Sequence, residues 1–229
     1  MIIAVSERAA ENLRIHLNVF SSKIRIIENG ANLISISEAV PYSKDEILTG
    51  GNGNTRIILN VARFCAAKDH TTLIKSMLYL PQNIHLILVG DGELKPFFIG
   101  MVKNLNLESR IHFFGIRQDI NRILKSVDII VMSSHYEGMS ISSIEGMASG
   151  KPFLASDVPG LHEIVYNAGI LFKPGDSCGL AGEITLLFEN SDLYDSITRK
   201  CMERAKDYDI SNTADSYMEV YKSLIARET

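Results

Sequence analysis

Cysteine is scarce in this sequence of 229 residues, and long apolar runs are missing. The three cysteines, Cys65, Cys178 and Cys201, are far apart and lack the Cys-x-x-Cys spacing of a metal site. We therefore expect free thiols in a reducing, cytosolic environment. No apolar run approaches the ~20 residues that span a bilayer. Met1–Arg8 has no basic region before its short apolar run, which argues against a signal peptide.

Runs of like charge are also missing. Acidic and basic residues are interspersed and the formal net charge is -4, so we expect no nucleic-acid partner. An anionic ligand must then be held by a few placed cations. The sequence shows no cluster of histidines and aspartates with the spacing of metal ligands, and we expect no metal cofactor. A hydrophobic content of 46% is ordinary for a globular protein and argues against disorder of the whole chain.

Short apolar runs rich in β-branched residues alternate with longer amphipathic segments, a pattern typical of parallel strands and their crossover helices. The sequence therefore predicts an α/β fold with a Rossmann-like, doubly wound parallel sheet. The predicted strands are Ile57–Val61, His85–Val89, Ile111–Phe114, Ile129–Met132, Phe153–Ala155 and Ile170–Phe172. The predicted helices are His70–Leu80, Glu93–Leu105, Asp119–Ser126, Ser142–Ser149 and Leu180–Glu189.

The first part of the chain differs from this pattern. Met1–Val5 and Lys23–Ile27 predict strands, with a helix over Ser6–Val19 that Ser6 caps. A stretch rich in glycine and asparagine, Gly50–Thr55, follows and offers no side chains suited to packing. We place the main domain after this boundary, at residues 50–208.

The tail, residues 209–229, ends in a helix predicted over Ala214–Ala226. Apolar side chains recur along it at helical spacing, so one face must pack against something. Two partners stay open, the core of the main domain and a neighbouring part of the protein. The stripe consists of Tyr217, Val220, Tyr221, Leu224 and Ile225.

The most informative segment is residues 134–152. It follows a predicted strand, so Glu137 and Gly138 should lie at the carboxyl edge of the sheet, where open α/β sheets bind ligands. A helix is expected to begin just after this point. The backbone N–H groups of Gly138, Met139 and Ser140 are then free to face an anion.

Glu137 and Glu145 would place two carboxylates near this anion site, which requires a ligand with distinct parts. A nucleotide sugar has such parts, because one carboxylate can accept hydrogen bonds from the ribose hydroxyls. The other can hold the sugar hydroxyls or face the positive charge that develops at the anomeric carbon. The alternative is a solvated loop acid and a helix-surface acid, and the spacing alone does not decide between the two interpretations.

Arg63 and Lys68 follow another predicted strand and precede a helix, again at the ligand edge. A guanidinium can bind a phosphate through two hydrogen bonds while an ammonium acts as a point charge. Together they would offset the charge that builds up on a departing diphosphate. Each cation taken alone would more often be a solvated surface residue, so the prediction depends on their combination with the two glutamates.

The order and spacing of several motifs resemble the family-four GT-B retaining glycosyltransferases, also called glycosyl transferases group 1. The resemblance covers nearly the whole chain. It is carried by Arg63-x4-Lys68, the turn Val89–Gly92, Phe113–Gly115, the run Glu137–Pro152, Ala155–Val165 and Gly169–Asp176.

The resemblance implies the C-terminal, donor-binding half of a GT-B fold and a role for each matching residue. Arg63 and Lys68 would bind the donor diphosphate as catalytic cations, and Glu137 would sit beside the transferred sugar as the third catalytic residue. Glu145 would hold the ribose. The remaining donor-binding residues would be Gly90, Gly115, Ile116, Arg117, Gly138, Met139 and Ser140.

The chain departs from the family because a full GT-B enzyme carries a second Rossmann-like half. Residues 1–49 resemble only the end of that N-terminal acceptor domain with the interdomain linker, and residues 209–229 resemble the helix that crosses back to it. We expect either a fragment or a truncated gene product. The implied partners are a nucleotide sugar such as a UDP-sugar, the missing acceptor domain, and a glycan or lipid-linked acceptor, with peripheral membrane attachment left open.

Three functions are compatible with this resemblance. The first is a hexosyltransferase of polysaccharide biosynthesis, acting in the cytoplasm or at the inner face of the membrane. The second is a nucleotide-sugar-binding module without turnover, which the missing half favours for this chain alone. The third is a GT-B-like epimerase, for which the sequence shows no acid and base groups around the sugar.

Overall fold

The computed structural model describes residues 1–226 and contains a six-stranded parallel sheet in the order β5-β4-β3-β6-β7-β8. Each predicted strand of the main domain is confirmed to within one residue at either end. Strands β6 and β7 are buried along their whole length, which explains their continuous apolar sequences. The bounds are β3 Arg56–Val61, β4 Ile84–Val89, β5 Ile111–Gly115, β6 Ile129–Met132, β7 Phe153–Ser156 and β8 Ile170–Phe172.

The strand order reverses between β3 and β6. From β3 the chain adds β4 and then β5 on one side, and it then returns to add β6, β7 and β8 on the other. A ligand crevice is expected at the carboxyl ends of the two strands that flank this reversal. The loop after β3 carries the predicted cations, and the loop after β6 and the helix that follows it, α7 (Ile141–Ala148), carry Glu137 and Glu145, so the topology brings both groups to one edge of the sheet.

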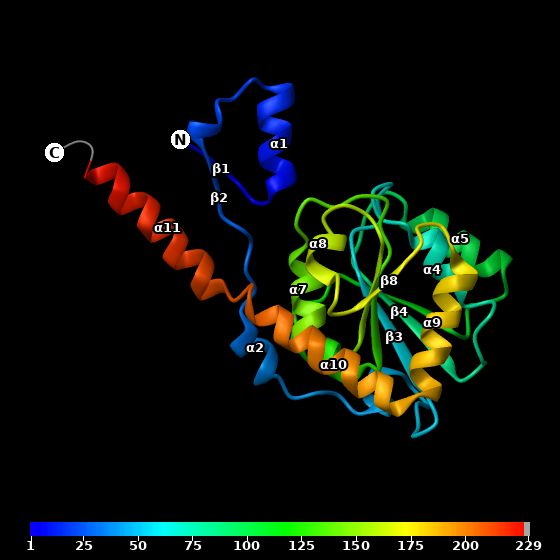
Figure 1. Ribbon diagram of the computed structural model, residues 1–229. Helices are drawn as coiled ribbons and strands as arrows, with labels where there is room; N and C mark the ends of the chain where they lie inside the picture. Colours follow the sequence, from blue (N-terminus) through cyan, green and yellow to red (C-terminus); the bar gives the residue numbers. More distant parts are fainter. Residues whose placement is uncertain (227–229) are drawn as a thin grey trace.

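Helices cover both faces of the sheet (Figure 1). Helices α4, α5 and α9 pack together on one face, and α6, α7 and α10 on the other. The short helix α8 was not predicted. The bounds are α4 His70–Ser76, α5 Lys95–Asn104, α6 Ile120–Ser126, α7 Ile141–Ala148, α8 His162–Val165, α9 Ser177–Glu189 and α10 Ser191–Lys206.

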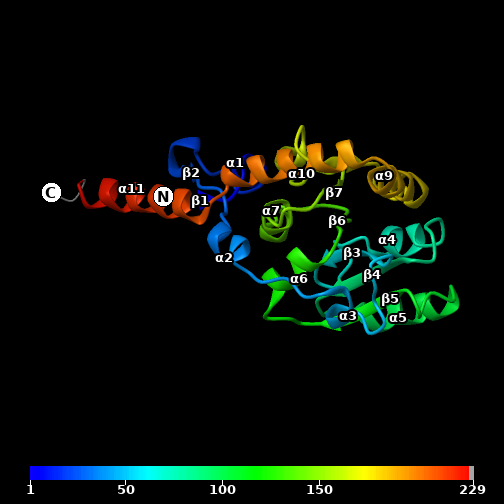
Figure 2. The same ribbon diagram turned by 90° about the horizontal axis from the view of Figure 1, so that it is seen from below.

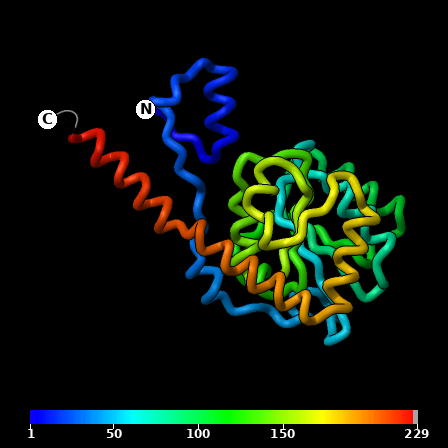
Figure 3. Tube along the Cα trace, viewed as in Figure 1, coloured from blue at the N-terminus to red at the C-terminus, as the bar shows by residue number. Residues whose placement is uncertain are grey.

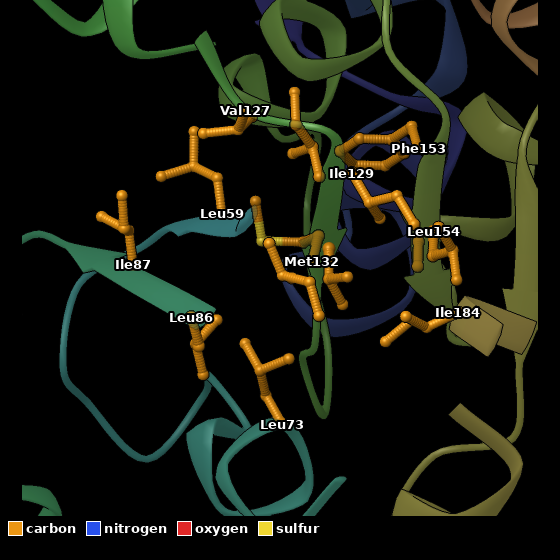
Figure 4. Packing of buried hydrophobic residues seen from close by; sticks show 14 of the residues in the cluster. Leu59, Leu73, Leu86, Ile87, Val127, Ile129, Met132, Phe153, Leu154 and Ile184 are labelled. Carbon is orange, nitrogen blue, oxygen red and sulfur yellow. The ribbon is translucent and has the colours of Figure 1, made fainter. Parts of the chain in front are cut away.

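The core lies between the sheet and these helices, and Figure 4 shows its packing. Leu59 and Met132 come from the two central strands, Phe153 and Leu154 from β7, and Ile184 from α9; each is at most 1% exposed. Burial of each such side chain contributes about 1.5–3 kcal/mol. The core therefore holds the strand ends that carry the site in a fixed frame.

The N-terminal residues form a separate small unit. Strands β1 (Ile2–Ala4) and β2 (Ile24–Ile26) pair in parallel, and α1 (Glu7–His16) connects them. Ser6 caps α1 as predicted, since its hydroxyl accepts a hydrogen bond from the N–H of Ala9 at 3.2 Å. Figures 1 and 3 show this unit set apart from the main sheet.

Two short helices that the sequence did not predict, α2 (Leu33–Ser37) and α3 (Lys44–Ile47), connect the N-terminal unit to β3. The last helix, α11 (Ile210–Ile225), extends away from the main sheet on the side of the N-terminal unit (Figures 1 and 3). Of its apolar stripe only Val220 is buried, while Ile225 is 67% exposed. The stripe therefore does not pack on the core of the main domain.

Candidate functional site

The loops after β3 and β6 are joined to each other at the reversal of strand order. Lys68 and Ser134 form an antiparallel bridge. The N–H of Asp69 donates to the carbonyl of Ser133 at 3.0 Å, and the N–H of His135 donates to the carbonyl of Ala67 at 2.9 Å. These bonds fix the two functional loops relative to each other.

Lys68 and Glu137 form an ion pair across this junction. Their side chains are 17% and 11% exposed, so the pair is shielded from water. The hydroxyl of Ser134 also donates to Oε1 of Glu137 at 2.8 Å. The carboxylate thus has two donors, and Lys68 is held beside the crevice by a partner that carries the opposite charge.

A cleft of about 330 Å³ opens at the carboxyl ends of β3 and β4. Arg63, Gly90, Ile116, Arg117 and Glu145 all line it, so the structure brings these five predicted residues together. The sequence did not predict its other lining residues, which are Val61, Ala62, Val89, Asp91, Ile120 and Ser142. Asp91 belongs to the Val89–Gly92 turn, and the turn motif was the only signal for it.

Arg63 and Glu145 both line this cleft but differ in their exposure to solvent. Arg63 is 74% exposed, and its Nη2 lies 3.4 Å from Oε2 of Glu93, a loose surface contact that leaves the guanidinium available. Glu145 lies on α7 and is partly buried. Burial raises the pKa of Glu145 above its ordinary value. A ligand that donates hydrogen bonds to this carboxylate would offset the desolvation of its ionised form.

Gly90 forms part of the cleft floor, at a position where a side chain would not fit. Its φ of +138° lies in a region that L-residues rarely adopt, and an added Cβ would lie 2.1 Å from the carbonyl oxygen of Ala62. The N–H of Gly90 donates to the carbonyl of Gly115 at 2.8 Å. The two predicted glycines therefore hold neighbouring loops together at the cleft.

The loop after β5 supplies the other wall. Ile116 is 78% exposed, the most exposed large apolar residue of the described chain. Arg117 pairs with Asp119 through two hydrogen bonds, Nε to Oδ1 at 2.7 Å and Nη2 to Oδ2 at 2.5 Å. Arg117 is thus an ordered wall of the cleft, with its charge balanced by a neighbour.

Gly138 and Met139 line a second, smaller cavity of about 110 Å³, shared with Ser6, Arg8 and Glu28 of the N-terminal part. Ser140 instead caps α7, its hydroxyl accepting from the N–H of Ser143 at 3.3 Å. Within residues 1–226, the backbone N–H groups of residues 138–140 have no acceptor. They lie at the start of α7, where an anion would be favoured.

The part of the chain that the structure describes contains no group of three or more His, Cys, Asp or Glu side chains arranged to hold a metal ion. None of its helices is both long and apolar enough to cross a membrane. The three cysteines are free thiols.

Comparison with known proteins connects this geometry to a family. The profile of the glycosyl transferases group 1 family matches residues 46–206. The chain is 30% identical, over 97% of its length, to the N,N'-diacetylbacillosaminyl-diphospho-undecaprenol alpha-1,3-N-acetylgalactosaminyltransferase of Campylobacter jejuni. It is 25% identical, over 93% of its length, to a UDP-Gal:alpha-D-GlcNAc-diphosphoundecaprenol alpha-1,3-galactosyltransferase of Escherichia coli. The chain spans 60% and 57% of these two relatives.

Solved structures show the same fold. The Anabaena protein HepE in complex with UDP and glucose aligns with a TM-score of 0.87 at 24% identity, over 97% of this chain and 63% of that one. The sucrose-phosphate synthase of Thermosynechococcus elongatus aligns with a TM-score of 0.84 at 26% identity, over 98% of this chain and 58% of its own. These alignments confirm the predicted GT-B-type sheet. The chain belongs to the glycosyl transferases group 1 family.

Proposed function

We propose that this chain supplies the donor-binding half of a retaining glycosyltransferase, which transfers a hexosyl group from a UDP-sugar to a glycan or lipid-linked acceptor. One observation carries the proposal. Arg63 and Glu145 face a single cleft at the carboxyl ends of β3 and β4, and the paired Lys68 and Glu137 lie where the loops after β3 and β6 join. One cation and one carboxylate thus line the cleft, whereas Lys68 and Glu137, which do not line it, form a second pair of opposite charge at the junction of the loops.

The donor would lie with its base against the loop of Gly115, Ile116 and Arg117, and with its ribose hydroxyls on Glu145. Gly90 allows close approach to the floor because it has no side chain. Arg63 and Lys68 would hold the diphosphate, and Glu137 would face the sugar. The free N–H groups of Gly138, Met139 and Ser140 would donate to the diphosphate or the sugar.

Retention requires that the acceptor oxygen attack the anomeric carbon on the face from which the diphosphate oxygen departs. The bond between carbon and the leaving oxygen breaks as the new glycosidic bond forms, and the acceptor proton passes to the leaving diphosphate. Arg63 and Lys68 stabilise the negative charge on that leaving group. The carboxylate of Glu137 stabilises the positive charge on the sugar.

The relatives support a lipid-linked acceptor, since the C. jejuni and E. coli enzymes are named for diphospho-undecaprenol substrates. We assign residues 1–49 to the end of an acceptor domain and its linker, 50–208 to the donor domain and 209–229 to the helix that returns toward the acceptor domain. We place the reaction in the cytoplasm, either in solution or at the inner face of the membrane.

A second function is favoured by the length of the chain, which spans about three fifths of the enzymes it resembles. The isolated chain would bind a nucleotide sugar without transferring it, because the acceptor must be held by the remaining part. Incubation with radiolabelled UDP-sugar and a diphospho-undecaprenol acceptor distinguishes the two functions. Transfer by this chain alone would show that it is a complete enzyme.

Isothermal titration calorimetry with UDP tests the site itself. Arg63→Ala and Glu145→Ala should each weaken binding by about 1–3 kcal/mol, the range for hydrogen bonds to charged groups. Lys103→Ala and Glu108→Ala, at exposed positions near the far end of α5, are matched controls and should bind as the unaltered chain does. Equal affinity of all four variants would refute the assignment of the cleft, and absence of UDP binding by the unaltered chain would refute the proposed function.

A further inference from the structure

The end of α2 and the segment between α2 and α3 run alongside helix α6 (Figure 2). Three side chains of α6 hold them in place. Nε of Arg122 donates to the carbonyl of Val40 at 2.9 Å, and Nζ of Lys125 donates to the carbonyl of Ser37 at 2.6 Å. The hydroxyl of Ser126 accepts from the N–H of Tyr42 at 2.7 Å. The segment is therefore fixed to α6 through both its main chain and Tyr42.

Asp119 stands at the N-cap of α6 but does not cap it. Aspartate is among the preferred N-cap residues because its carboxylate normally accepts from the free N–H groups of the first turn. Here both carboxylate oxygens point elsewhere. Oδ1 and Oδ2 accept from Arg117, and Oδ2 also accepts from the hydroxyl of Tyr42 at 2.6 Å. Asp119 therefore does not cap α6, and its carboxylate instead connects Tyr42, in the segment between α2 and α3, to Arg117 in the wall of the cleft.

Tyr42 itself is held on two sides. Its ring lies under the guanidinium of Arg122, whose central carbon is 3.8 Å from the ring centroid. Its hydroxyl fixes one oxygen of Asp119, which leaves the carboxylate a single orientation toward Arg117. The hydrogen bonds from Arg117 and from Tyr42 hold the pKa of Asp119 well below its usual range, so the carboxylate stays ionised and the connection does not titrate near neutral pH.

We infer that Tyr42 is a positioning residue for the nucleoside end of the donor, acting through Asp119 to hold the Arg117 guanidinium in the wall of the cleft. This inference rests on the proposed function, because it assumes that the cleft receives the nucleotide. Tyr42 belongs to the segment that leads toward the N-terminal unit. The hydrogen bonds from Tyr42 to Asp119 and from Arg117 to Asp119 therefore connect the position of that segment to the position of Arg117 in the cleft wall.

A double-mutant cycle measured by calorimetry with UDP tests the inference. Tyr42→Phe removes only the hydroxyl and should weaken UDP binding by about three- to tenfold, the effect of one hydrogen bond. In an Arg117→Ala background the same substitution should have no further effect, because the residue through which Tyr42 acts is gone. Tyr79→Phe, at an exposed tyrosine on the far side of the sheet, is the matched control and should leave the affinity unchanged.

The outcomes separate this inference from the proposed function. If the unaltered chain binds UDP and Tyr42→Phe has no effect, or if its effect persists in full beside Arg117→Ala, the inference is overturned while the cleft assignment stands. If the unaltered chain does not bind UDP, both are overturned. Thermal unfolding of each variant gives a second readout, since a merely structural role would lower the melting temperature in both backgrounds equally.

Discussion

Glu137→Gln should strengthen UDP binding, although it removes a residue from the proposed catalytic site. Glu137 pairs with Lys68, and both side chains are largely shielded from water. The carboxylate therefore competes with the diphosphate for the ammonium and also repels it. Removal of this partly shielded negative charge from the neighbourhood of the diphosphate should lower the free energy of UDP binding by on the order of 1 kcal/mol. The affinity for UDP should rise about fivefold.

Calorimetry with UDP at fixed ionic strength measures this effect, and Lys68→Met should shift the affinity in the opposite direction. Glu108→Gln removes an equal charge from the remote surface and controls for net charge. UDP lacks the sugar that Glu137 is proposed to face, so no contact is lost in this experiment. Weaker binding by Glu137→Gln would refute the reasoning, because it would mean that Glu137 holds the nucleotide directly.

Two further predictions concern the framework of the site. Gly160 has a φ of +88°, and an added Cβ would lie 2.3 Å from the carbonyl oxygen of Glu137. Gly160→Ala should therefore lower the free energy of unfolding, measured by chemical denaturation, by about 1–3 kcal/mol and weaken UDP binding, measured by calorimetry. Gly182→Ala is the control and should do neither, because its added Cβ meets nothing within 4 Å. Burial raises the pKa of Glu145, so its favourable contribution to stability is present below the unfolded pKa and is lost as pH rises through the folded one. Glu145→Gln should therefore stabilise the chain increasingly as the pH rises from the ordinary pKa of a glutamate, about 4.3, through the raised pKa of Glu145, and a difference in melting temperature that does not change with pH would contradict the assignment.

The strands of the main domain were predictable because parallel strands buried on both faces appear as short continuous apolar runs. Their ends then located the ligand edge without further information, and Arg63, Gly90 and Glu145 were found together there. The short helices α2, α3 and α8 were not predictable in this way. Each spans only four or five residues and carries no periodic apolar pattern, so their form depends on contacts with the folded domain.

The site contains features that local sequence patterns do not encode. An aspartate at the start of a helix is expected to cap it, but the carboxylate of Asp119 instead accepts hydrogen bonds from Arg117 and Tyr42. Tyr42 lies 77 residues away from Asp119 in sequence. Only the folded arrangement of the segment between α2 and α3 along α6 reveals that a tyrosine outside every motif is connected, through Asp119, to Arg117 in the wall of the cleft.

The pairing of Lys68 with Glu137 shows the same limit at the centre of the proposed chemistry. Both residues were predicted to lie at the ligand edge of the sheet, with separate roles. They are 69 positions apart in the sequence, and they meet where Lys68 and Ser134 form a bridge between the loops. A cation already neutralised by a carboxylate attracts an anionic ligand less strongly than a free one. If the diphosphate binds Lys68 as proposed, Glu137 would share its cationic partner and become a stronger negative centre beside the sugar. Donor binding would thus prepare the carboxylate for the positive charge of the transition state.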